Sequence, residues 1–174
     1  GCLPTLNDLG ILRNENLLEG GETSTHIYME KFIDDNLHSY TRNRDRLDLE
    51  GTSRLSMGLH FGTLSVRTLW RRVSEQGSGE EVQAFLRELL WREFAHHWLW
   101  ERPDLLERPF RADFEGFPWR NREVHWQAWV EGRTGYPLVD AAARQLLAQG
   151  FVHNRARMVA ASFLAKHLLV DFRR

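Results

Sequence analysis

A stretch of helical periodicity between Ser78 and Trp100 limits the possible folds more than any other part of the chain. Its apolar residues recur every three to four positions, which predicts one buried helix face: Val82, Phe85, Leu86, Leu89 and Phe94. Glu80 and Glu81 occupy the first turn, where the helix dipole favours acidic side chains. Pro103 ends the run because proline cannot continue a helix. A helix of this length needs other helices to cover its apolar face.

The rest of the chain repeats the same pattern. Helical spacing is present in residues 23–40, 66–73, 122–130, 138–149 and 153–172, and Ser65 is placed to cap the second of these. Gly132 and Gly150 follow apolar runs, as C-terminal glycines do. Residues 104–121 are rich in proline and aromatic side chains and are predicted to be irregular. No segment alternates long enough to predict a strand, so we expect an all-α helical bundle.

Composition excludes several classes of protein. The chain has 174 residues, 42% of them hydrophobic and 27% charged, which is typical of one globular domain. No apolar run is long enough for a membrane span. All but two of the 23 basic residues are arginine, but the formal net charge is −1, so nucleic-acid binding would require a local patch. From composition alone, codon bias is the preferred explanation of the arginine excess. Cys2 is the only cysteine, which rules out an internal disulfide and favours a reducing, cytoplasmic location.

A second face of the long predicted helix carries functional side chains. Glu88, Trp91 and Arg92 lie at i, i+3 and i+4, where a carboxylate, an indole and a guanidinium can meet a planar polar ligand. An ordinary surface stripe with an internal ion pair is the alternative. Glu93 and His96 match half of a di-iron motif, but no partner motif exists, so no metal site is predicted. The remaining residues of this part are predicted to pack: His96, His97, Trp98 and Trp100.

Two shorter segments have the chemistry of anion sites. Asn154, Arg155 and Arg157 occupy the start of the last predicted helix, ahead of a proposed buried stripe of Val159, Phe163, Leu164 and His167. The segment Gly51-Thr52-Ser53-Arg54-Leu55-Ser56 offers three hydroxyls and could cradle a pyrophosphate. A solvated helix start and simple helix caps are the respective alternatives.

Taken together, longer motifs occur in a recognisable order. They are Tyr40-x-x-x-Arg44-Asp45, Thr52-Ser53-Arg54-Leu55-Ser56, Leu59-His60-Phe61-Gly62, Glu88-Leu89-Leu90-Trp91-Arg92-Glu93-Phe94, Phe117-Pro118-Trp119, the run from Gln127 to Ala142, and His153-Asn154-Arg155-x-Arg157-Met158. From about Gly20 to Arg174 the chain resembles the helical FAD-binding domain of the DNA photolyase/cryptochrome family. The resemblance implies a linker over residues 1–20 and a partial domain over 21–174, truncated at its C-terminal end.

The resemblance also implies roles for individual residues. FAD would be held by Tyr40, Thr52, Ser53, Arg54, Leu55, Ser56, Arg92, Asn154 and Arg157. A flipped pyrimidine dimer would be received by Glu88 and Trp91, with Asn154 and Met158 at the reaction site. DNA would be contacted by Arg44, Glu88, Trp91, Asn154 and Arg155. Trp119 matches the outermost tryptophan of the family's electron-transfer series, whereas the middle position is Phe172.

Two comparisons within the family refine the expected function. Enzymes that repair (6-4) lesions have a histidine pair where this chain has Asn154 and Met158, which favours repair of cyclobutane dimers. Met57 stands where the family usually has a proline, so a looser loop is expected. Two alternatives remain open: a cryptochrome-like flavin photoreceptor, and a flavin-free remnant that binds DNA or protein. Apolar surface left uncovered by truncation would allow self-association.

Overall fold

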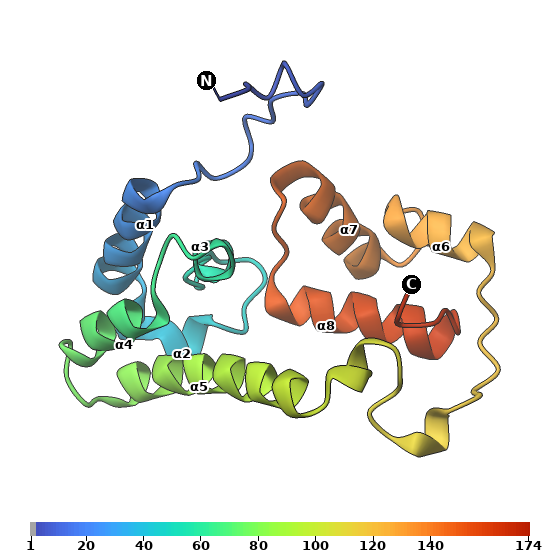
Figure 1. Cartoon of the computed structure of the whole chain (residues 1–174). Helices are drawn as coiled ribbons and strands as arrows, with labels where there is room; N and C mark the ends of the chain where they lie inside the picture. The colour runs from blue at the N-terminus through green and yellow to red at the C-terminus, as the bar shows by residue number, and fades with distance from the viewer. Residues whose placement is uncertain (1–2) are drawn as a thin grey trace.

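The computed structural model describes residues 3–174, and within them all regular structure is helical (Figure 1). The α-helices are α1 (Glu22–Asp35), α2 (Tyr40–Asn43), α3 (Ser56–Phe61), α4 (Val66–Ser74), α5 (Glu80–Glu101), α6 (Glu123–Val130), α7 (Pro137–Gln149) and α8 (Asn154–Ser162). Short 3-10 turns cover Leu37–Ser39, Pro103–Leu106 and Ala112–Phe114, and a π-helical turn, Phe163–His167, extends α8. The all-α prediction is therefore confirmed. Cys2 lies outside the described residues.

The first half of the chain forms a lobe around α5. One cluster of buried apolar side chains joins α1, α2, α4 and α5, and Leu69 and Val73 of α4 are completely buried in it. Three aromatic rings lie at its centre, where Phe32 packs 4.7 Å from Phe85 and Tyr40 packs 5.2 Å from the same ring, centroid to centroid. Ser65 accepts a hydrogen bond from the backbone N–H of Arg67, as a capping residue should. We call this part the N-terminal lobe.

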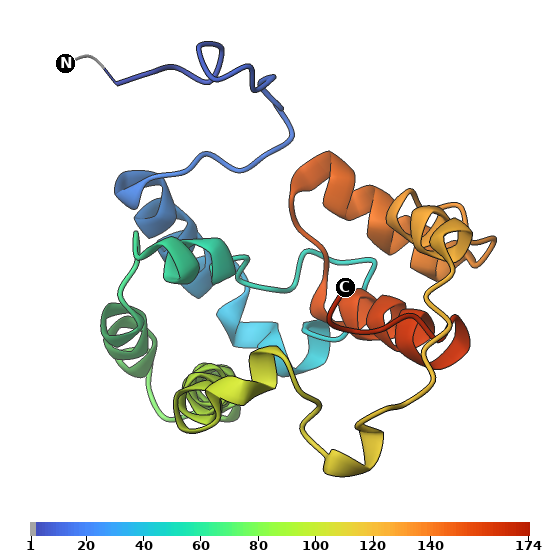
Figure 2. The same cartoon turned by 45° about the vertical axis from the view of Figure 1, so that its right-hand side comes forward.

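The second half forms a separate lobe from α6, α7 and α8. Its buried cluster consists of Val139, Ala142, Val152, Ala156, Ala160 and Phe163, with Trp129 packed against it. Small residues on α8 allow α7 to approach closely, and the Trp129 indole donates to the carbonyl of Ala160 at 3.0 Å. Gly150 ends α7 in the left-handed conformation, as predicted. Figure 2 shows this C-terminal lobe beside the N-terminal lobe, with the segment between α2 and α3 passing between them.

Four details of the sequence prediction are wrong. Phe94 and Trp100 were expected to pack, but they are 51% and 84% exposed because α5 runs beyond the helices that cover its first half. His96 and His97 are exposed for the same reason. Val159 and His167 are exposed, whereas Phe163 and Leu164 are buried as predicted, and Ala156 and Ala160 continue the buried stripe along α8. The predicted helix 153–172 ends early, since α8 changes to a π-helical turn after Ser162.

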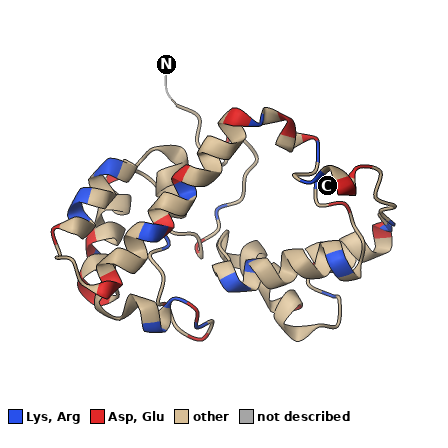
Figure 3. Cartoon of the chain, turned by 90° about the horizontal axis from the view of Figure 1, so that it is seen from below, with Lys and Arg blue, Asp and Glu red and all other residues tan. Residues whose placement is uncertain are grey.

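Charged residues are distributed without a dominant sign. Figure 3 shows basic and acidic positions interspersed over the N-terminal lobe, whereas α8 of the C-terminal lobe carries only basic ones. Among residues 3–174, no helix has both the length and the apolarity that crossing a membrane requires. Any anion-binding function therefore depends on local geometry.

Candidate functional site

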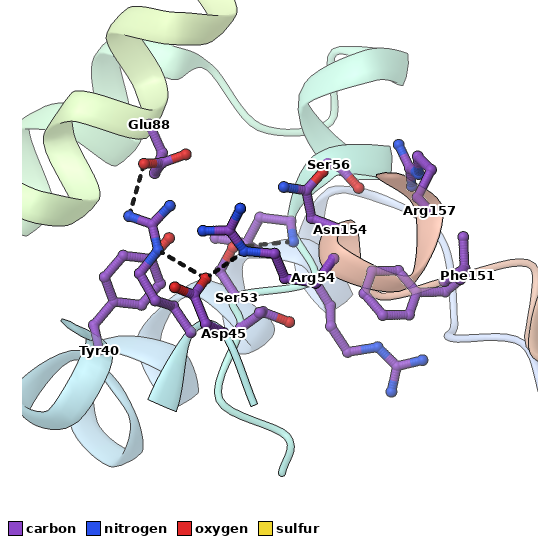
Figure 4. A pocket seen from close by; sticks show the side chains of 14 residues that line it. Tyr40, Asp45, Ser53, Arg54, Ser56, Glu88, Phe151, Asn154 and Arg157 are labelled. Atoms are coloured by element: carbon purple, nitrogen blue, oxygen red, sulfur yellow. Dashed lines mark hydrogen bonds and ion pairs between the residues drawn. The ribbon is translucent and has the colours of Figure 1, made fainter. Parts of the chain in front are cut away.

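A cleft of about 250 Å³ lies where the two lobes meet, and segments distant in sequence line it. Its lining residues are Tyr40, Arg44, Asp45, Thr52, Ser53, Arg54, Leu55, Ser56, Glu88, Phe151, Val152, Asn154, Arg155 and Arg157. Figure 4 shows the side chains of this cleft, contributed by α2, the segment before α3, α5 and the start of α8. The structure thus brings together most of the residues that the sequence predicted separately.

The mouth of the cleft holds a chain of four charged side chains. Arg44 Nη1 lies 2.7 Å from Glu88 Oε1, and Arg44 Nε lies 3.7 Å from Asp45 Oδ1. Arg155 Nε donates to the same Asp45 oxygen at 2.8 Å (Figure 4). The hydrogen bond from Arg155 lowers the pKa of Asp45, and the pKa of Arg155 is raised in return. Asp45 therefore joins α2 of one lobe to α8 of the other.

Arg54 is held in an unusual environment. Its backbone φ is +52°, in the left-handed region that side chains other than glycine rarely adopt. Its guanidinium lies over the Phe151 ring at 4.5 Å, and its Nη2 donates to Gln149 Oε1 at 3.3 Å. Its Nε is buried and has no hydrogen-bond partner within the protein. A buried donor of this kind calls for an acceptor, and strained backbone is most common at functional sites.

Hydroxyl groups surround this arginine. Thr52 and Ser53 are half-buried before α3, and Ser56 begins that helix. Leu55 is buried in the N-terminal core, which anchors the segment. Gly51 permits the close approach to α2, since a Cβ there would lie 2.7 Å from Asn43 Cβ and 2.8 Å from Asn43 O. The segment 51–56 therefore presents hydroxyls and a cation to the cleft from a fixed base.

Tyr40 and Asn154 complete opposite walls. Burial raises the pKa of Tyr40 to about 12, so its hydroxyl keeps its proton at physiological pH. The Arg44 guanidinium carbon lies 5.3 Å from the centre of the Tyr40 ring. Asn154 is exposed at the start of α8, with its Nδ2 3.9 Å from Met158 Sδ. The walls thus offer neutral hydrogen-bonding groups between the cations.

Four residues predicted for the site lie outside the lining of this cleft. Trp91 is 63% exposed one turn beyond Glu88 on α5, and Met158 is 53% exposed one turn beyond Asn154 on α8. Arg92 points toward α3, where its Nη2 lies 3.4 Å from the Leu59 carbonyl oxygen. Trp119 lies in the connection before α6 and packs edge-on against Phe172, with ring centroids 6.1 Å apart. The sequence pattern placed these residues correctly on their elements without fixing their distance from the cleft.

Three lining residues were not among the predicted site residues. Asp45 belongs to the quoted motif after Tyr40, and its position next to Arg44 was the available signal. Phe151 and Val152 line the cleft because the turn after Gly150 directs them inward. Within residues 3–174, no group of three or more His, Cys, Asp or Glu side chains is arranged to hold a metal ion.

Comparison with known proteins identifies the architecture. Residues 85–174 match the family described as the FAD binding domain of DNA photolyase. The chain is 46% identical to a deoxyribodipyrimidine photo-lyase from Thermus thermophilus over 159 residues, which cover 91% of this chain and 37% of that protein. The chain thus spans little more than a third of that relative.

Solved structures agree with this result. A bacterial class III photolyase from Agrobacterium tumefaciens superposes with a TM-score of 0.90 at 36% identity, covering 98% of this chain and 38% of that one. A cryptochrome from Synechocystis sp. superposes with a TM-score of 0.87 at 31% identity and the same coverage of both chains. An all-helical fold, a matching family and superposition over 98% of the chain lead to one conclusion: this chain belongs to the DNA photolyase/cryptochrome family and corresponds to part of its FAD-binding domain.

Proposed function

We propose that this chain forms the cofactor- and lesion-binding part of a light-driven deoxyribodipyrimidine photo-lyase, which repairs cyclobutane pyrimidine dimers in DNA. The observation that carries the proposal is the cleft between the lobes, where hydroxyls, arginines and a carboxylate from four segments converge. The names of the relatives support the same reaction.

The residues present fit FAD. The unpartnered Nε of Arg54 and the hydroxyls of Thr52, Ser53 and Ser56 suit phosphate oxygens, which accept several hydrogen bonds at once. Arg157 lines the same cleft from α8 and would lie beside the flavin ring. The cleft volume of about 250 Å³ is too small for a whole FAD molecule, so we expect the cleft to hold only part of the cofactor unless the lobes move apart.

Bound FAD in its reduced form supplies, after absorbing light, the electron that splits the dimer. The chain's own residues position the substrate. Glu88 would accept hydrogen bonds from the edge of a flipped base, while Trp91, one turn further along α5, would stack on its face. Asn154 would donate an amide hydrogen bond, and Met158 would line the apolar side of the lesion. Arg44 and Arg155 would contact phosphates, which fixes the strand without reading its sequence.

The first test is cofactor retention. The purified chain is mixed with FAD, freed of excess cofactor and examined by visible absorption. A retained, structured flavin band supports the proposal and justifies assaying dimer repair under illumination. Absence of any retained flavin contradicts FAD binding by this chain.

The second test concerns lesion recognition and uses two tryptophans of α5. Trp91→Ala removes the proposed stacking surface, whereas Trp100→Ala removes a more exposed indole nine residues further along. Stacking on a base is worth about 1–3 kcal/mol, so Trp91→Ala should weaken binding to dimer-containing DNA roughly 5- to 150-fold. Undamaged DNA should be affected less. Equal losses in both variants, or equal losses on both DNAs, would count against the assignment.

A flavin photoreceptor of the cryptochrome type is the second candidate. The close superposition on a cryptochrome favours it, because the fold alone does not separate the two functions. A light-induced spectral change in the FAD-loaded chain, without repair of dimer-containing DNA, would establish this candidate instead.

A further inference from the structure

Both arginines proposed to contact DNA are already paired with carboxylates. Glu88 binds Arg44 at 2.7 Å, and Asp45 binds Arg155 at 2.8 Å while remaining 3.7 Å from Arg44. Two guanidinium groups and two carboxylates leave this four-residue network with no formal net charge. A neutral network contributes little attraction for phosphates, because nonspecific DNA binding depends on unpaired positive charge.

Glu88 faces two competing demands. Its Oε1 holds Arg44 in the free protein, yet the proposed function requires the same carboxylate to accept hydrogen bonds from a flipped base. Arg44 already occupies Glu88 Oε1, so we expect a base that binds this oxygen to weaken the ion pair with Arg44. The Arg44 side chain is 23% exposed, so it already borders the solvent from which a strand would approach.

Asp45 is the second carboxylate that holds these arginines in place. It is the residue between the two arginines, and the hydrogen bond to Arg155 crosses from one lobe to the other. The pKa of Asp45 is lowered by this hydrogen bond, so its carboxylate stays ionised at physiological pH.

We propose, building on the function above, that Asp45 and Glu88 keep Arg44 and Arg155 paired until a flipped base engages Glu88 and releases Arg44 to a backbone phosphate. Asp45 is then a specificity-determining residue. It lowers affinity for undamaged strands, and lesion recognition and backbone binding are coupled through Arg44. This coupling requires no sequence-specific contact with the bases.

The test compares Asp45→Asn with Asp48→Asn. Both changes remove one negative charge from the same segment, but Asp48 pairs only with the exposed Arg46, through a 3.0 Å bond from Arg46 Nε. Binding is measured with a single-stranded oligothymidine carrying one cyclobutane dimer and with the same strand lacking it. Several salt concentrations are used, because the salt dependence counts the phosphates contacted.

Asp45→Asn should bind the undamaged strand at least threefold more tightly than Asp48→Asn does. It should also discriminate less between the two strands. The slope of log affinity against log salt should become steeper by about 0.7 for each additional phosphate contact on a single strand. Equal behaviour of the two variants overturns the inference, and so does weaker binding of the undamaged strand by Asp45→Asn.

A second variant protects the test against misfolding of Asp45→Asn. Glu88→Gln also frees Arg44 and should raise affinity for the undamaged strand above that of Asp48→Asn; no increase overturns the inference. Failure of the underlying function has a different signature. If the wild-type chain binds both strands equally, the proposal of lesion recognition is wrong. The affinities of the variants for the undamaged strand still show whether the carboxylates restrain the arginines.

Discussion

Replacement of Gly51 by alanine tests whether the segment 51–56 is held at a fixed distance from α2. The new Cβ would lie 2.7 Å from Asn43 Cβ, 2.8 Å from Asn43 O and 3.0 Å from Asn43 C. Two of these atoms are backbone, so no side-chain rotation relieves the contact. Because carbon atoms pack at roughly 3.5 Å or more, the segment must move by about 0.7 Å.

The expected cost follows from two opposing terms. Overpacking of this kind destabilises by about 1–3 kcal/mol. Alanine also restricts the unfolded chain, which returns about 0.4–1 kcal/mol. We therefore expect Gly51→Ala to lower the free energy of unfolding by about 1–2 kcal/mol. The displaced hydroxyls of Thr52 and Ser53 should weaken FAD binding by about tenfold, which corresponds to roughly 1.4 kcal/mol.

Urea unfolding and titration with FAD measure these two effects. Gly20→Ala is the matched control, since no atom lies within 4 Å of the Cβ it would introduce and its backbone is outside the left-handed region. The reasoning is refuted if Gly51→Ala unfolds and binds FAD as Gly20→Ala does. If Gly51→Ala lowers stability but leaves FAD affinity unchanged, the predicted steric clash is supported and the proposed role of segment 51–56 in FAD binding is refuted.

Leu69→Ala tests the packing of the N-terminal lobe and Asp140→Ala that of the C-terminal lobe, with Leu147→Ala as an exposed control. Leu69→Ala should lower the unfolding free energy by about 2–5 kcal/mol, because Leu69 is completely buried. Leu147 is 61% exposed, so Leu147→Ala should change the unfolding free energy by less than about 0.5 kcal/mol. Chemical denaturation measures both. Asp140 is buried and accepts hydrogen bonds from Thr134 N, Thr134 Oγ1 and Gly135 N, so Asp140→Ala should cost about 2 kcal/mol at neutral pH. Burial opposes ionisation of Asp140, but the hydrogen bonds outweigh it and lower the pKa of this carboxyl. The stabilisation by Asp140 should therefore be complete above the unfolded-state pKa of about 4 and should disappear as the pH falls through the folded-state pKa. A difference in unfolding free energy between wild type and Asp140→Ala that stays constant down to the lowest pH would contradict this assignment.

The sequence was sufficient to predict the helical class and most element positions. Periodicity identified α5 and α7 because each places one apolar face against a neighbour, and glycine and serine signals located the ends of α4 and α7. Phe94 and Trp100 show the limit of this reasoning. Periodicity reports which residues share a face, but only the tertiary arrangement determines how far along α5 that face is covered.

The site shows the same division. Motifs placed Tyr40, Glu88 and Asn154 on their elements, and the fold brought all three to one cleft. The pairing of Asp45 with Arg155 spans 110 positions, and no local pattern encodes a contact of that range. The left-handed backbone of Arg54 was not predicted either, because nothing in the sequence around this residue indicates a positive φ.

The arrangement of the two lobes gives the cofactor a structural role as well as a chemical one. Their buried apolar clusters are distinct, and polar contacts bridge them: Arg155 with Asp45, Arg54 with Gln149, and Asn14 with the carbonyl of Ala148. Polar contacts at an accessible surface each contribute little, so the lobes are free to separate at modest cost. A ligand that fills the cleft touches both lobes and therefore binds only when the lobes are together. At a free ligand concentration about one hundred times the dissociation constant, such binding stabilises the assembled lobes by about 2.7 kcal/mol. Because the segment between α2 and α3 carries both the hydroxyls of the cleft and the Asp45 carboxylate at its mouth, cofactor binding should also fix the two arginines that we propose contact DNA.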